Sequence, residues 1–368
     1  MFYPAAFHPG QPRYAWRVIL LALHELHQEL DANFGVVHGE EVVAGYGDVA
    51  AERKALGSSV GVIDLSCRSR LCLAGADRVK FLHGQVTNDV QRLRAGEGCY
   101  AALVNAKGRM HSDLNIYRLE DELLLDFEPG YRAAVTERLE KYIITEDVQV
   151  LDAAPHYGLL SAQGPRAMEA VRALGLDWQP PEKPMVFATV EDVTLGRLYL
   201  MNQARTGTTG FDLFVPAAAL GAVFDKLVAA ATSLGGRSVG WNALEIARIE
   251  AAIPRFGQDM DETILPPEAG LESHAISYSK GCYIGQEVIA RIRTYGQVAK
   301  ALRSLRLPTD LTNPPAKGDK LLVDGKEVGT ITSAVPGFAL GYVRKEHFAT
   351  GTQLVLLTAA GECLVVVC

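Results

Sequence analysis

The sequence predicts an α+β protein in which mixed α/β domains are followed by a small C-terminal β-barrel. Helix-like and strand-like segments alternate from about residue 48 to residue 252. Beyond about residue 295 the pattern changes to short strands separated by glycines and prolines. The 368 residues also exceed the roughly 150 residues of one average domain, which indicates two to three domains. With 48% hydrophobic and 21% charged residues, the composition is typical of a compact globular chain.

The N-terminal part, residues 1–35, is expected to form a loose arm followed by one helix. Prolines and a glycine interrupt residues 1–12. From 13 to 33, apolar residues recur at spacings of three and four and define one helical stripe: Trp16, Ile19, Leu20, Leu23, Leu26 and Leu30. Gly35 would end this helix. Because Glu25 and Glu29 oppose binding to an anionic membrane surface, we expect the stripe to pack on the main body.

The middle part, residues 36–294, is expected to contain two interwoven α+β subdomains. Helices are predicted at 48–56, 77–85, 129–143 and 239–252, with two more introduced by Gly164-Pro165 and Pro216. Strands are predicted at 60–65, 70–73, 99–104, 110–118, 122–127, 153–162, 195–202 and 211–215. Between 254 and 270 the chain is rich in proline and glycine, and such a long irregular segment is typical of a functional loop.

The C-terminal part, residues 295–368, is predicted to contain only strands. Apolar segments of strand length are separated by turn residues at 302–307, 319–323, 327–334, 338–343, 353–357 and 362–367. Short strands at this spacing form a small barrel or a sandwich, and we predict a barrel.

Charge and cysteine content exclude several classes of protein. The formal net charge of −7 and a pI near 5.8 give no overall field that attracts nucleic acid, so no direct nucleic-acid partner is expected. No apolar run approaches the ~20 residues of a membrane span, and no signal peptide is evident, so no membrane partner is expected. The six cysteines contain no C-x-x-C pair, which argues against a metal site and favours a reduced, cytoplasmic protein.

The densest chemical signal is the segment 279–291, SKGCYIGQEVIAR. Cys282 precedes a helix-like stretch, where free amide groups and the helix dipole would stabilise a thiolate, and Lys280 would add a positive charge. Gly281 and Gly285 would let a partner approach the sulfur closely. The alternative is a buried structural cysteine beside an ordinary glycine turn, and composition alone favours that alternative.

This segment resembles the Lys-Gly-Cys-Tyr-x-Gly-Gln-Glu signature of the YgfZ family, and every fixed position is matched between Lys280 and Glu287. The chain from about residue 48 to residue 300 also resembles the T-protein of the glycine cleavage system. The matching landmarks are 61–66, 81–89, 108–117, 248–250 and 257–262. The resemblance implies a T-protein-like multidomain ring of mixed α/β domains, with residues 1–35 as an additional element.

The resemblance further implies tetrahydrofolate as the cofactor. Glu250 falls at the T-protein glutamate that holds the pterin, and one carboxylate can accept hydrogen bonds from two adjacent N–H groups of that ring. The alternative for Glu250 is a solvated helix carboxylate paired with Arg248 or Arg255. Arg291 and Arg293 follow the signature and are candidates to bind the anionic glutamate tail, although either is also explained as a surface residue.

Four more candidates surround the loop that approaches the folate in this superfamily: Tyr100, Asn105, Met110 and Asp113. Tyr100 and Met110 are residue types that more often belong to the core. T-proteins carry a Gly-Gly-x-x-Asp-Asp segment, in which Ser112 replaces the first acid here and Asp113 remains. Phe211 replaces the glutamate of their Tyr-Thr-Gly-Glu motif. These departures weigh against glycine cleavage.

The candidate catalytic residues are therefore Cys282, Lys280 and Asp113. YgfZ-like proteins are implicated in assembling or maintaining iron–sulfur enzymes, including radical tRNA-modifying enzymes. The resemblance thus implies a tetrahydrofolate-binding accessory protein that acts through Cys282 on iron–sulfur client enzymes. Since clusters usually take about four thiolate ligands, contact with a client would be transient. Two alternatives stay open: a folate-dependent methyl or aminomethyl transferase with Asp113 as the acid, and a folate-sensing scaffold that binds other proteins.

Overall fold

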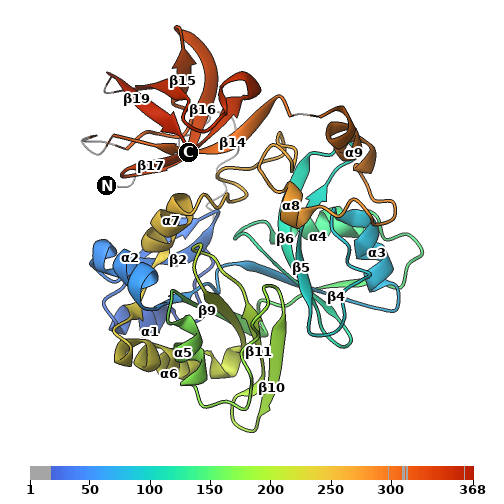
Figure 1. Cartoon of the computed structure of the whole chain (residues 1–368). Helices are drawn as coiled ribbons and strands as arrows, with labels where there is room; N and C mark the ends of the chain where they lie inside the picture. Colours follow the sequence, from blue (N-terminus) through green and yellow to red (C-terminus); the bar gives the residue numbers. More distant parts are fainter. Residues whose placement is uncertain (1–17, 297, 309–310, 312–313, 360) are drawn as a thin grey trace.

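A computed structural model describes residues 18–296, 298–308, 311, 314–359 and 361–368. Figure 1 shows a six-stranded sheet with its helices, a five-stranded sheet with its helices, and a barrel formed by the C-terminal strands. The prediction of mixed α/β parts followed by a C-terminal barrel is confirmed. Within the described residues, no helix combines the length and the apolar character needed to cross a membrane.

The six-stranded sheet has the order β10-β11-β12-β9-β3-β13. Its strands are β3 (Gly61–Asp64), β9 (Tyr157–Gln163), β10 (Phe187–Asp192), β11 (Gly196–Asn202), β12 (Gly210–Pro216) and β13 (Arg237–Ser238). Neighbouring strands are antiparallel except for β13, which pairs with β3 in parallel. Helices α5 (Ala167–Arg172) and α6 (Leu220–Ser233) pack on this sheet. In α6 the buried Leu220, Val223, Phe224 and Leu227 follow helical spacing, so one face of the helix enters the core.

The five-stranded sheet has the order β5-β6-β7-β4-β8. Its strands are β4 (Ser69–Ala74), β5 (Gly98–Val104), β6 (Met110–Arg118), β7 (Leu123–Phe127) and β8 (Gln149–Asp152). Helices α3 (Arg78–Gln85) and α4 (Arg132–Glu140) share a core with it. Alternate residues of β5 face opposite sides: Ala101 and Leu103 join that core, whereas Ala102 and Val104 pack against the segment 256–276. The sheet is therefore covered on both faces.

Further helices and a two-stranded hairpin precede and follow the strands of the two sheets. They are α1 (His24–Glu29), β1 (Asn33–Val37), β2 (Glu40–Gly45), α2 (Val49–Ser58), α7 (Trp241–Glu250), α8 (Glu272–Ala275) and α9 (Gln286–Tyr295). Helix α7 packs against α2 and β2 and also contacts two barrel strands, β16 (Lys326–Val335) and β17 (Phe338–Arg344). This helix therefore lies at the junction of the barrel with the rest of the protein (Figure 1).

The barrel closes in the order β14-β17-β16-β15-β18-β19. Its strands are β14 (Lys300–Arg306), β15 (Lys320–Val323), β16 (Lys326–Val335), β17 (Phe338–Arg344), β18 (Gln353–Thr358) and β19 (Gly361–Val367). Each strand overlaps one of the segments predicted from the sequence, and all pairings are antiparallel. Leu305, Leu321 and Ile331 are among the apolar side chains that fill its interior.

The predicted N-terminal helix is wrong over residues 18–23 and 30–33, while residues 1–17 lie outside the described part of the chain. Gly35, expected to end this helix, lies within β1. Helix α1 begins only at His24, because Ile19 instead exchanges backbone hydrogen bonds with Gly39 and Glu41 beside the β1–β2 hairpin. Ile19 and Leu20 are 50% and 60% exposed, so this part of the stripe is not packed. Pairing with a neighbouring strand has replaced the local helical preference.

Candidate functional site

A cavity of about 560 Å³ lies between the two sheets, helix α7 and the loop that follows it. Its wall includes Tyr100 from β5, Asp113 from β6, Arg205 from the loop before β12, Trp241 from α7, and His274. This volume falls within the range of roughly 300–1,000 Å³ that is usual for small-molecule sites. Tyr100 and His274 stack with their ring centroids 5.6 Å apart, which gives the cavity an aromatic wall.

Asp113 is the acid of this cavity whose hydrogen bonding is incomplete. The Tyr100 hydroxyl donates to its Oδ2 over 2.8 Å, whereas its Oδ1 is buried and has no partner within the described residues. Burial, with a contribution from the nearby Glu128 carboxylate, raises the pKa of Asp113 to about 6. A carboxyl group with this pKa can exchange a proton close to neutral pH.

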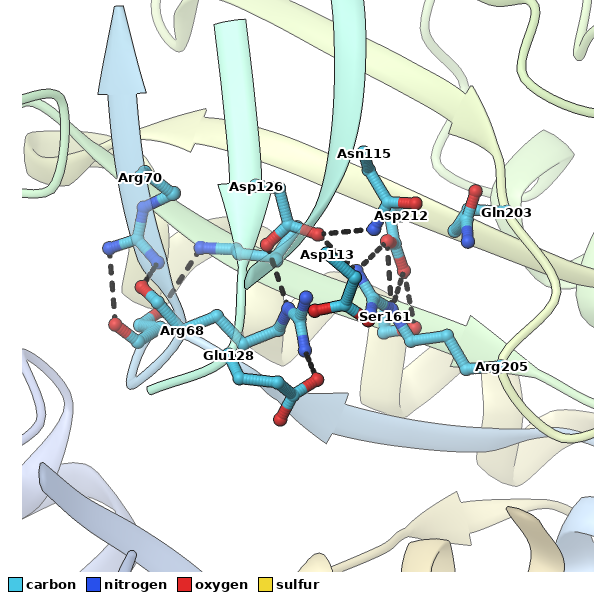
Figure 2. Close-up of polar contacts among 12 residues, drawn as sticks. Arg68, Arg70, Asp113, Asn115, Asp126, Glu128, Ser161, Gln203, Arg205 and Asp212 are labelled. Atoms are coloured by element: carbon cyan, nitrogen blue, oxygen red, sulfur yellow. Dashed lines mark hydrogen bonds and ion pairs between the residues drawn. The ribbon is translucent and has the colours of Figure 1, made fainter. Parts of the chain in front are cut away.

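A buried ion network stands beside Asp113 (Figure 2). Arg68 donates to Asp126 over 2.7 Å and to Glu128 over 2.5 Å, and Arg205 donates to Asp212 and, over 2.9 Å, to the second oxygen of Asp126. Burial opposes ionisation of Asp126, yet the two guanidinium groups hold its pKa well below the ordinary value. These charges compensate one another and fix the positions of the strands that carry them.

A second ion network connects the cavity to the barrel. Arg248 of α7 donates to Asp259 over 2.5 Å and to the Ser333 hydroxyl of β16 over 2.9 Å. Asp259 also accepts a hydrogen bond from Ser333 over 2.6 Å. Arg255 lies over the Trp241 ring, 4.1 Å from its centroid. The arginines that line the cavity thus already have partners, and the cavity wall depends on a strand of the barrel for one of them.

Asp113→Asn should change the pH dependence of stability. Because the folded-state pKa of Asp113 is raised to about 6, its contribution is fully present below the unfolded pKa of about 3.9 and is lost as pH rises through about 6. Relative to wild type, the variant should therefore gain on the order of 2 kcal/mol in free energy of unfolding between pH 4 and pH 7. Urea unfolding of both proteins across this range measures the difference. A constant difference would mean that Asp113 titrates normally.

The predicted site residues do not all lie together. Tyr100 and Asp113 line the cavity, whereas Cys282 does not, and its thiol is free and exposed. The side chain of Lys280 is buried, and its ammonium donates to the carbonyls of His83, Val86 and Asn88 over 2.5, 2.6 and 2.9 Å. Burial lowers the pKa of Lys280 to about 8, so the group remains mainly protonated at pH 7.

Cys282 lies three residues before Gly285, the N-cap of α9. The amide of Ile284 donates to Gly84 in α3 over 3.0 Å, and that of Gln286 donates to Tyr283 over 3.2 Å. Cys282 thus lies before the first turn of α9, and the effect of a helix dipole declines with distance from that turn. Stabilisation of a Cys282 thiolate by α9 stays a prediction.

The other candidates for folate binding lie outside the cavity. The guanidinium of Arg53 donates its Nε–H to Oε2 of Glu250 over 2.7 Å. Glu250 therefore forms an ion pair, as the alternative interpretation expected, but with Arg53 rather than with Arg248 or Arg255. Met110 is fully buried in a hydrophobic cluster. Arg291 is exposed and lies 4.0 Å from Glu287 of the same helix.

Arg293 and Asn105 complete the set of predicted residues. The guanidinium of Arg293 lies over the Tyr278 ring, 4.0 Å from its centroid. The side chain of Asn105 accepts hydrogen bonds from the amides of Lys107 and Arg109, so it stabilises its own turn. Both residues have local structural partners and neither lines the cavity.

Several residues of the cavity were missed by the sequence analysis. The set comprises Arg68, Glu128, Arg205, Trp241, Arg248, Arg255 and His274, together with Asp126 and Asp212 behind the wall. One signal was available, because Asp126 interrupts the apolar run of β7 and a lone acid there is usually paired. No cluster of three or more His, Cys, Asp or Glu in the described residues is arranged to hold a metal ion.

Two protein-family models match most of the chain. A family model described as the GCVT N-terminal domain matches residues 23–280. The chain belongs to this family. The model of the CAF17 C-terminal beta-barrel domain matches residues 302–367, which span nearly the whole closed barrel. The GCVT match covers both sheets and all of the residues that line the cavity.

Individual GCVT relatives and a solved structure agree with this assignment. A protein of Arabidopsis thaliana named as a chloroplastic transferase is 29% identical over 342 residues, which cover 90% of this chain and 76% of that protein. An aminomethyltransferase of Saccharopolyspora erythraea is 26% identical over 341 residues, 90% of this chain and 92% of that protein. The crystal structure of the glycine cleavage system aminomethyltransferase T from Bartonella henselae superimposes with a TM-score of 0.85 at 24% identity, covering 95% and 96% of the two chains. This likeness confirms the predicted T-protein-like fold.

Proposed function

We propose that this protein is a tetrahydrofolate-binding accessory protein of the YgfZ type that supports iron–sulfur enzymes through Cys282. The observation that carries the proposal is the free, exposed thiol of Cys282 within a segment that is otherwise firmly attached to the protein. The family match and the CAF17-type barrel support the same assignment.

The cavity between the sheets is the proposed folate site. Its volume suits a molecule of this size, and Asp113 offers a buried oxygen without a partner to the N–H donors of a pterin. Tyr100 and His274, which stack on each other, place aromatic rings in the cavity wall, where a planar ring can pack. When bound, tetrahydrofolate supplies one-carbon chemistry. The protein's own contribution here is to position the ring, exclude water and hold a proton on Asp113.

The attachment of the signature segment explains how an exposed thiol can have a fixed position. The ammonium of Lys280 connects the segment to three carbonyls at the end of α3, and the amide of Ile284 adds a fourth link to Gly84. Cys282 lies between these two anchored residues, so its backbone is restrained while its sulfur stays in solvent. A client protein can therefore meet the sulfur without first ordering the segment.

One thiol is suited to a transient role. Iron–sulfur clusters usually take about four thiolate ligands, and a single cysteine supplies only one. The other exposed cysteine of the chain is Cys368 at the C-terminus. We therefore propose that Cys282 makes transient contact with a cluster, persulfide or disulfide of a client protein. The cluster belongs to the client and is not a resident cofactor of this protein.

Cys282→Ala should abolish support of iron–sulfur enzymes while folate binding persists, because the thiol lies outside the cavity. Cys368→Ala is the matched control, since it removes another free and exposed thiol and should retain full activity. The measurement is the activity of cluster-dependent enzymes in cells whose own gene has been deleted, with tetrahydrofolate affinity of each purified variant alongside. Full rescue by Cys282→Ala would contradict a thiol mechanism.

The alternative is a folate-dependent methyl or aminomethyl transferase. It is favoured by the raised pKa of Asp113 within the cavity and by several relatives that are named aminomethyltransferases. Rescue by Cys282→Ala together with loss of activity in Asp113→Asn would support this alternative over the accessory role.

A further inference from the structure

A second concavity, of about 550 Å³, lies between the turn that joins β5 to β6 and helix α4. It shares no lining residue with the cavity between the sheets. Asn105, His111 and the C-terminal end of α4 contribute to its wall. Three of its side chains are cationic: Lys107, Arg138 and Lys141.

Arg138 is a buried cation without a carboxylate partner. It is 8% exposed, and its guanidinium donates to the Gln85 side chain and to the Val104 carbonyl, each over 3.0 Å. It also lies over the Tyr142 ring, 4.1 Å from its centroid. Both hydrogen-bond acceptors are neutral, and within the described residues Arg138 forms no ion pair and its Nε has no hydrogen bond. This contrasts with Arg68, which is bound by two carboxylates.

Buried charges in proteins are usually paired, so an anion from outside the chain would complete this site. Burial lowers the pKa of Arg138, although a guanidinium remains protonated at any ordinary pH. Its fork of N–H donors suits the planar or tetrahedral oxygens of carboxylate and phosphate groups.

The acidic side chains at the concavity do not neutralise Arg138. Glu137 is exposed at the rim, and the side chain of Glu262 is 75% exposed and 3.9 Å from His111. Exposed carboxylates are screened by solvent and contribute little to a neighbouring buried charge. Burial and the charges of Arg138 and Lys141 lower the pKa of His111, so its imidazole is neutral near pH 7.

We propose that this concavity binds the phosphate or carboxylate group of a small molecule, with Arg138 as the buried anchor and Lys107 and Lys141 at the rim. The concavity shares no lining residue with the cavity between the sheets, and Cys282 does not line it. A bound anion would also interact with the imidazole of His111, which supplies a direct spectroscopic readout.

Nuclear magnetic resonance titration of the full chain with inorganic phosphate, and separately with succinate, tests the proposal. We expect a saturable shift of the His111 imidazole resonances at roughly millimolar anion, and a rise in the pKa of His111 when the anion is bound. The double substitution Lys107→Ala and Lys141→Ala should weaken binding at least about tenfold. Both lysines are exposed, so this variant should fold. Arg138→Met, which keeps an unbranched apolar stem but removes the charge and the N–H donors, should abolish binding.

The control is a double substitution that removes the same charge elsewhere, Lys226→Ala and Lys345→Ala, because both of those lysines are exposed outside the concavity. Tighter binding of phosphate than of succinate would identify a phosphorylated ligand, and the reverse order a carboxylate ligand. Absence of saturation by roughly 10 mM for both anions, or an equal loss in the two double variants, would overturn the proposal.

Discussion

Arg205→Met should lower the free energy of unfolding by about 3–5 kcal/mol. The guanidinium of Arg205 is bound by Asp212 and Asp126, and both carboxylates are completely buried. Removing it leaves Asp212 without a cation inside the protein, and an uncompensated buried charge is far more costly than the ion pair was favourable. Arg68 still neutralises Asp126, so the loss falls mainly on Asp212.

The matched control for Arg205 is Arg197→Met. Arg197 pairs with Glu191, and both side chains are more than half exposed, at 55% and 60%. Such a surface pair contributes about 0–1 kcal/mol, so the control variant should be close to wild type. Urea unfolding with a fixed slope compares the two variants directly. Equal effects would mean that Asp212 is neutral in the folded protein and that the buried network carries no full charge.

Gly285→Ala should be the most disruptive single change in the signature segment, at roughly 2–4 kcal/mol. Gly285 has φ of +82°, and a Cβ there would lie 2.5 Å from the Asn105 carbonyl and 3.0 Å from the Gly108 Cα. Both contacts are with backbone, which cannot rotate away as a side chain would. The substitution therefore has to separate the start of α9 from the turn between β5 and β6.

Gly296→Ala provides the control at the opposite end of the same helix. Gly296 also has a positive φ, +92°, but a Cβ there would meet no atom of the described residues within 4 Å. Its cost should be limited to the backbone term, about 1 kcal/mol. Unfolding measurements give both values, and amide hydrogen exchange at residues 280–285 reports whether the segment has detached. If the two substitutions cost the same, the contact with Asn105 does not hold the segment.

Local patterns predicted most of the fold. The strand predicted at 110–118 has the bounds observed for β6, and the spacing of apolar segments predicted each barrel strand. Strands β8, β10 and β13 and the hairpin of β1 and β2 were missed, since they depend on partners rather than on an intrinsic pattern. The same competition shortened α1, where pairing of Ile19 with the hairpin outweighed a helical stripe.

The site was less accessible to sequence reasoning because its contacts join distant residues. Arg68 and Asp126 are 58 positions apart, and Arg205 and Asp126 are 79 apart. Nothing in the local sequence indicates which buried arginine meets which acid. The family resemblance pointed to Tyr100 and Asp113, which flank one hairpin turn, whereas the ion pair of Glu250 with Arg53 spans 197 positions.

The hydrogen bond from Arg248 to Ser333 attaches the C-terminal barrel to helix α7. Asp259 and the Thr332 hydroxyl reinforce this junction over 2.6 Å, and α7 carries Trp241 into the cavity wall from the same helix. Moving the barrel relative to α7 would have to break these buried hydrogen bonds, and a buried polar group left unpaired costs free energy. The position of the barrel relative to α7 and the position of part of the cavity wall are therefore fixed by the same buried side chains.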